Sequence, residues 1–207
     1  MAEQLGQQLL ELRRRELSAW REGWLPAGND FADRRVAVQI DGGRVRLREN
    51  KKRKKNSKKK KGTRRKFDTP WREPKALVIF EFDERGKMVH KDRQPLIDGT
   101  LLGPDHLAEL VAFHLYRLGA AQAELVVFIS DGAPWIWNRL EWIERRAGLD
   151  SCKTIHVLDF CHAAHHISLA LAALGLGGDA RRKTYGCLRK LLKKSRYDEV
   201  VWELKER

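Results

Sequence analysis

A chain of 207 residues is long enough for one hydrophobic core, or for one core with a small appendage. Hydrophobic residues make up 42% and charged residues 34%, which is typical of a folded protein with a highly charged surface. Three cysteines without a C-x-x-C spacing exclude a disulfide framework and a thiol zinc ribbon.

Membrane and export signals are missing from the sequence. The N-terminal residues do not resemble a signal peptide, and the longest apolar stretch, residues 167–176, is too short to span a bilayer. We therefore expect a cytoplasmic protein with no membrane partner.

The first half of the chain predicts one helix and three strands. Leucines at helical spacing predict an amphipathic helix over residues 3–22, which packs on the core or on a partner. Residues 35–40 and 44–48 alternate apolar and polar side chains around Asp41-Gly42-Gly43, the pattern of a β-hairpin. A long basic loop follows, and residues 75–82 predict the third strand.

The second half predicts alternating helices and strands. A helix opens at Pro104 and keeps its apolar period to Leu118, with Gly119 as its C-cap. The remaining expected elements are a strand at 125–130, a helix at 134–146, a strand at 154–160, a helix at 162–174 and basic helices near 180–194 and 197–206.

This order predicts an α/β fold with a mixed five-stranded sheet and helices on both faces. The first and fourth strands are expected to be parallel neighbours. The expected organisation is an N-terminal helix and linker over 1–34, a core over 35–178 that contains a disordered basic loop at 50–74, and basic helices over 179–207.

The basic charge of the chain is concentrated in one segment. Removing the twelve basic residues of segment 51–66 from the net charge of +14 leaves +2 for the rest. Such a run repels itself unless a polyanion neutralises it, and binding to a nucleic acid is favoured over a solvated loop or a localisation tag. The candidate DNA-binding residues are Lys51, Lys52, Arg53, Lys54, Lys55, Lys58, Lys59, Lys60, Lys61, Arg64, Arg65 and Lys66.

Three aspartates follow the predicted parallel strands: Asp41, Asp131 and Asp159. Ligands bind beyond the carboxyl ends of such strands, and a carboxylate pair there suits Mg²⁺ or Mn²⁺ in phosphoryl transfer. Each aspartate also has an ordinary interpretation: a hairpin turn for the first, a helix cap for the second and a structural carboxylate for the third.

A second group of metal-ligating residue types follows Asp159. Cys161 and His165 are four residues apart, as are His162 and His166, so either pair could share a helix face and bind zinc. Histidines that pack around the start of a helix are an alternative interpretation, and a position of His162 near a scissile phosphate is a third.

Several segments resemble DDE transposases of bacterial insertion sequences, the ISKra-type group related to mutator-like elements. They are VQIDGGRVR at 38–46, WREPK at 71–75, SDGAPWIW at 130–137 and DFCH at 159–162. The resemblance implies an RNase H-like fold, Mg²⁺- or Mn²⁺-dependent DNA cleavage and joining, and catalytic, metal-binding roles for Asp41 and Asp131. It also implies that Asp159 and His162 are accessory residues near the active site.

The family's third acid, a glutamate in a Gly-Ser-Gly-x-x-Glu context, has no counterpart in this sequence, and Glu199, Glu203 and Glu206 do not fit that context. We therefore expect a truncated, nucleoid-associated transposase whose own activity is left open. Its expected partners are element-end and target DNA, a second copy or a full-length transposase. The alternatives are a catalytically silent DNA-binding remnant and, more remotely, an unrelated zinc-dependent hydrolase.

Overall fold

The computed structural model describes residues 2–50, 67–89, 94–149 and 153–206. The helices are α1 (Ala2–Arg21), α2 (Pro104–Arg117), η1 (Ala120–Gln122), α3 (Pro134–Ala147), α4 (Phe160–Ala173), α5 (Gly178–Lys193) and α6 (Tyr197–Lys205). The strands are β1 (Arg35–Gly42), β2 (Val45–Arg46), β3 (Glu49–Asn50), β4 (Phe67–Asp68), β5 (Trp71–Arg72), β6 (Lys75–Glu81), β7 (Leu96–Thr100), β8 (Leu125–Ser130) and β9 (Thr154–Leu158).

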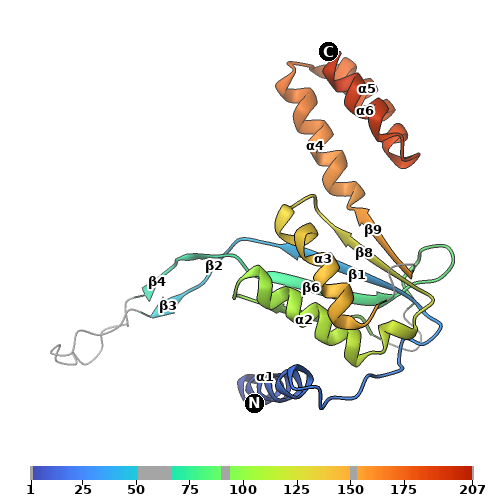
Figure 1. Ribbon diagram of the computed structural model, residues 1–207. Coiled ribbons are helices and arrows are strands. Elements are labelled where there is room, and N and C mark those ends of the chain that lie inside the picture. The colour runs from blue at the N-terminus through green and yellow to red at the C-terminus, as the bar shows by residue number, and fades with distance from the viewer. Residues whose placement is uncertain (1, 51–66, 90–93, 150–152, 207) are drawn as a thin grey trace, which may run out of the picture.

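The central sheet has five strands in the order β7-β6-β1-β8-β9 (Figure 1). Strand β1 is antiparallel to β6 and parallel to β8, and β9 continues in parallel beyond β8. The prediction of a mixed five-stranded sheet, with the first and fourth predicted strands as parallel neighbours, is therefore confirmed.

The membership of the sheet differs from the prediction in one strand. Segment 44–48 does not enter the central sheet, because β2 pairs with β5 in a separate ladder. The missing place is taken by β7, which pairs with β6 and was not predicted. Its Gly99 lies where an added Cβ would approach the Lys75 carbonyl oxygen to 2.7 Å, so a close backbone approach explains a glycine inside this strand.

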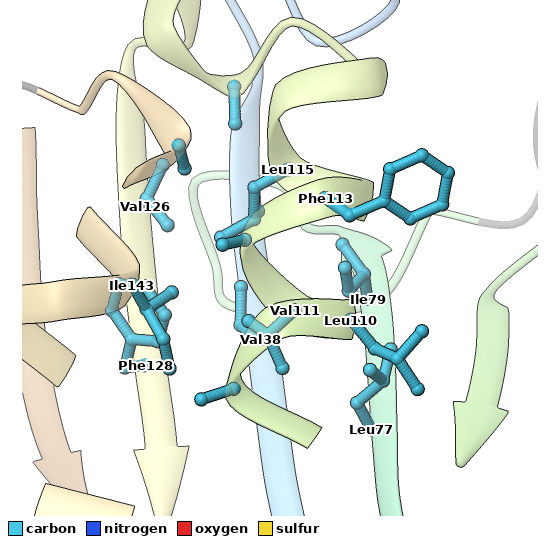
Figure 2. Packing of buried hydrophobic residues seen from close by; sticks show 14 of the residues in the cluster. Val38, Leu77, Ile79, Leu110, Val111, Phe113, Leu115, Val126, Phe128 and Ile143 are labelled. Carbon is cyan, nitrogen blue, oxygen red and sulfur yellow. The ribbon is translucent and has the colours of Figure 1, made fainter. Parts of the chain in front are cut away.

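Helices α2 and α3 cover one face of the sheet. Figure 2 shows Val38 and Phe128 on the strands facing Leu110 and Ile143 on these helices, and all four side chains are at most 2% exposed. Both helices begin with proline at the first turn, and α2 is followed by Gly119 with a φ of 73°, as the sequence predicts.

The opposite face of the sheet is largely open. Ile97, Ile155 and Val157 point to that side and are 74%, 49% and 40% exposed. Helices α4 to α6 instead form their own apolar cluster around Leu171 and Leu188, and Figure 1 shows them rising beyond the end of β9. The expectation of helices on both faces is thus met on one face only within the described residues.

The prediction of a disordered loop over 50–74 is wrong for residues 67–72, which contain β4 and β5. β2 pairs with β5 and β3 with β4, and the four short strands form a narrow two-stranded arm that leaves the sheet after β1 (Figure 1). Arg46 lies over the ring of Trp71 at 4.7 Å, and Arg48 over that of Phe67 at 3.9 Å. The twelve predicted DNA-binding residues at 51–66 lie outside the described residues.

Helix α1 packs on the core through its C-terminal half only. Leu17 and Trp20 are buried, whereas Leu5 and Leu9 are 57% and 58% exposed. Arg13 pairs with Asp98 of β7, which also accepts a hydrogen bond from His114 of α2 at 2.8 Å. Asp98 therefore joins β7 and the following helix α2 to α1, which is distant from both in sequence.

Stability should fall in acid because of this carboxylate. Burial alone raises the pKa of Asp98, but hydrogen bonds from His114 and the Gly99 amide, together with the charge of Arg13, outweigh it and lower the pKa below its usual value. A lowered folded-state pKa contributes stability that is full above the unfolded-state value of about 3.9 and is lost as pH falls through the folded-state value.

We expect urea midpoints measured from about pH 6 down to about pH 2 to decline less steeply in Asp98→Asn than in the wild type. Asp179→Asn, at an 85% exposed side chain on α5, is the matched control and should keep the wild-type slope. A wild-type slope in Asp98→Asn would show that this carboxylate does not govern acid stability.

Candidate active site

The three predicted aspartates lie in one row at the carboxyl ends of β1, β8 and β9. The parallel register pairs Ile40 with Ser130 and Ser130 with Leu158, so Asp41, Asp131 and Asp159 each follow directly on a registered residue. Neighbouring strands are about 4.8 Å apart, which puts the backbones of Asp41 and Asp131 roughly 5 Å apart and Asp159 about 10 Å from Asp41.

Strand alternation decides which way the first two side chains project. Ile40 and Ser130 are buried on the side covered by α2 and α3. The residues that follow them, Asp41 and Asp131, therefore project toward the open side of the sheet. Both carboxylates therefore lie at the same edge of the sheet and on the same face, which is the arrangement needed for two side chains that share a ligand.

Both carboxylates also make local turn contacts. Oδ1 of Asp41 accepts a hydrogen bond from the Gly42 amide at 2.7 Å, and Oδ1 of Asp131 accepts one from the Ala133 amide at 3.1 Å. Within the described part of the chain, no group of three His, Cys, Asp or Glu side chains is close enough to hold a metal ion. The hairpin-turn interpretation of Asp41 is wrong, because Asp41 lies within β1 and pairs with Ala76 of β6. The helix-cap interpretation of Asp131 is also wrong, because Ala133 is the N-cap of α3. A cation role for the pair stays a prediction.

Asp159 has a structural role in this row. Its amide donates to the Ser130 carbonyl oxygen at 2.8 Å, and its Oδ1 accepts from the amides of Cys161 at 2.7 Å and His162 at 3.4 Å. The side chain is therefore the N-cap of α4, which confirms the interpretation of a carboxylate bonded to backbone amides.

Two residues beside the row were not singled out from the sequence as site residues. The ring of Trp135, in the first turn of α3, lies where a Cβ on Gly42 would meet it at 3.3 Å, and the Nζ atom of Lys75 lies 5.2 Å from its centroid. Lys75 is also the strand partner of Gly42. A cation and an indole thus border Gly42, on the helix-covered side of the sheet and opposite to the side toward which Asp41 projects.

The other two tryptophans of α3, Trp137 and Trp142, differ in how far they are buried. Trp137 donates from Nε1 to the Asp131 carbonyl oxygen at 2.8 Å and packs against the apolar core, which fixes the loop after β8. Trp142, in contrast, is 40% exposed.

A cavity of about 810 Å³ opens next to Asp131, between the sheet margin and helices α4 and α6. Most of its wall is apolar, and its polar residues are Asp131, His162, His166 and Tyr197. The two imidazoles face one another, with their Nε2 atoms 2.9 Å apart. His162 therefore lies on the wall shared with Asp131, as expected for a residue near the candidate site.

No family model matches the chain, and neither does any curated protein or solved structure. Within the described residues, no helix is both long and apolar enough to cross a membrane. A functional proposal therefore depends on the local geometry of the aspartate row, the arm and the cavity.

Proposed function

We propose that this chain is part of an RNase H-like DNA transposase core in which Asp41 and Asp131 hold Mg²⁺ or Mn²⁺. The observation that carries the proposal is the parallel register of β1 and β8, which puts both carboxylates after adjacent strand ends on one face. Carboxylate oxygens are the ligands that both ions prefer. The sequence resemblance to DDE transposases gives the same two residues the same role.

The chemistry would be attack on a DNA phosphodiester. Within the described residues the Oδ2 atoms of Asp41 and Asp131 accept no hydrogen bond, so they are available to a cation, while each Oδ1 atom accepts a hydrogen bond from a nearby backbone amide. A divalent cation bound there would supply charge stabilisation for an in-line phosphoryl displacement. Gly43 and Gly132 have no heavy atom within 3.4 Å of an added Cβ, which leaves room for a phosphate backbone.

The arm supports DNA as the substrate. Its first strand, β2, is separated from β1 by two residues, Gly43 and Arg44, so Asp41 lies near the base of the arm. Arg44, Arg46 and Arg48 follow one another along this side of the arm. The guanidinium groups stacked on Trp71 and Phe67 are held in position over exposed rings. A narrow basic ribbon of this type fits the major groove of duplex DNA and leads into the lysine-rich segment at 51–66.

A second candidate function, a catalytically silent DNA binder, is favoured by the state of the third aspartate. Asp159 is committed to capping α4, and no third carboxylate joins Asp41 and Asp131 among the described residues. Two acids seldom hold both ions of a two-metal site, so we expect weak or absent strand transfer by this chain alone.

The test is nicking of supercoiled plasmid and of labelled duplex DNA with Mn²⁺, alongside Mn²⁺ binding followed by electron paramagnetic resonance. We expect Asp41→Asn and Asp131→Asn each to weaken Mn²⁺ binding and to lower any nicking rate by at least about 100-fold, the scale of losing one electrostatic stabiliser. Asp179→Asn, on the exposed surface of α5, is the control.

Retention of both Mn²⁺ binding and nicking in Asp131→Asn would eliminate the carboxylate pair as the site. Mn²⁺ binding that depends on both aspartates, without nicking by the wild type, would instead favour the silent DNA binder.

A further inference from the structure

We infer that His162 and His166 form a binding site for a borderline transition-metal ion, with Zn²⁺ as the best-fitting example. The site is separate from the carboxylate pair in ligand type, because imidazole nitrogen suits Zn²⁺ and carboxylate oxygen suits Mg²⁺ or Mn²⁺. It does not depend on the proposed DNA chemistry.

The geometry of the two rings carries the inference. Both side chains lie on the same face of α4, four residues apart, and their Nε2 atoms point at one another across 2.9 Å. Two nitrogens bound to one tetrahedral Zn²⁺ at 2.0 to 2.1 Å are about 3.3 Å apart. An increase of about 0.4 Å in the distance between the two Nε2 atoms would therefore make the rings a pair of metal ligands. Small side-chain rotations can supply this change.

The cavity supplies the rest of the coordination shell. Both histidines lie on the wall of the space of about 810 Å³ that Asp131 also lines. A tetrahedral ion held by two protein nitrogens keeps two positions for water or an entering oxygen ligand, so it has one protein ligand fewer than a catalytic zinc site. The ion would thus add positive charge to a cavity whose remaining wall is mostly apolar.

The alternative pair on the same helix is less suitable. Cys161 and His165 have the same spacing, but neither lines this cavity. His165 has a ring contact with His166 at 6.0 Å between centroids, compared with 4.6 Å for His162 and His166. Because its spacing from Cys161 is the same, His165 is the matched control for the proposed pair.

The test is calorimetric titration of the untagged chain with Zn²⁺ in a Cys161→Ser background, which removes the thiol as a ligand. We expect one Zn²⁺ per chain, at least about tenfold weaker binding in His162→Ala and in His166→Ala, and less than about twofold change in His165→Ala. His162→Gln, which keeps a hydrogen-bonding group beside His166, should lose Zn²⁺ as His162→Ala does.

Circular dichroism confirms that each variant is folded, and a variant that does not fold is replaced by the glutamine substitution at the same position. Unchanged Zn²⁺ binding in His162→Gln and His166→Gln, or an equal loss in His165→Ala, would overturn the inference. Absence of Zn²⁺ binding by the Cys161→Ser protein would do so as well, and would leave the 2.9 Å contact as a simple hydrogen bond between imidazoles.

Discussion

Gly28→Ala is expected to lower the free energy of unfolding by at least about 3 kcal/mol. An added Cβ at this position would lie 2.0 Å from the carbonyl oxygen of Arg117, which is backbone and cannot move away as a side chain can. The same crossing brings the Gly28 carbonyl within 2.2 Å of a Cβ on Gly119, whose φ is 73°. The linker before β1 therefore passes the end of α2 at a distance that only glycines allow.

Urea unfolding followed by tryptophan fluorescence measures this effect. Gly186→Ala is the matched control, because no heavy atom lies within 4 Å of its added Cβ and it lies inside helix α5. We expect its stability to stay unchanged or to rise by up to about 1 kcal/mol, because alanine is favoured over glycine inside a helix. Equal midpoints for Gly28→Ala and the wild type would mean that this backbone crossing is not present in solution.

Replacing residues 51–66 by a neutral Gly/Ser segment of equal length is expected to weaken DNA binding and to flatten its salt dependence. Each phosphate neutralised contributes about 0.9 to the slope of log K against log salt. Twelve basic residues lie in the segment, so engagement of even a third of them changes the slope by about 4. A loss of this size amounts to orders of magnitude in affinity at low salt.

Fluorescence anisotropy of a labelled duplex between about 50 and 200 mM salt measures the slope. The control variant exchanges three exposed basic residues of α5, Arg182, Lys183 and Lys190, for glutamine, which tests basic charge at another position. A slope unchanged by the 51–66 replacement would show that this segment does not contact the duplex. An equal change in the α5 variant would show that the position of the charge is not decisive.

The parts of the fold predicted from sequence are those with a local signal. The buried strands β1 and β8 and the helices α2 and α3 have clear apolar periods, glycine ends or proline starts. Strand β7 has no such signal. Its Asp98 is explained by partners on α1 and α2, and its Gly99 is explained by close contact with β6. Long-range contacts of this kind cannot be read from a local pattern.

The same distinction applies to the candidate site. The aspartate row was predictable because each aspartate directly follows a strand, and parallel strands end at one edge. Lys75 and Trp135 were not, because they reach Gly42 from a neighbouring strand and from a helix that are far away in the sequence. The predicted hairpin of 35–40 with 44–48 is wrong: β2 covers only Val45–Arg46 and pairs with β5, a partner beyond the basic segment that no local pattern reveals.

The cap at Asp159 links the C-terminal helices mechanically to the sheet. The carboxylate fixes the first turn of α4, while its amide is bonded to Ser130, the residue before Asp131. The position of α4 relative to the sheet therefore depends on hydrogen bonds next to the aspartate row. Residues of α4, α5 and α6 line the cavity beside Asp131, so a molecule that binds these helices and shifts them would change the width of the cavity without contacting either carboxylate.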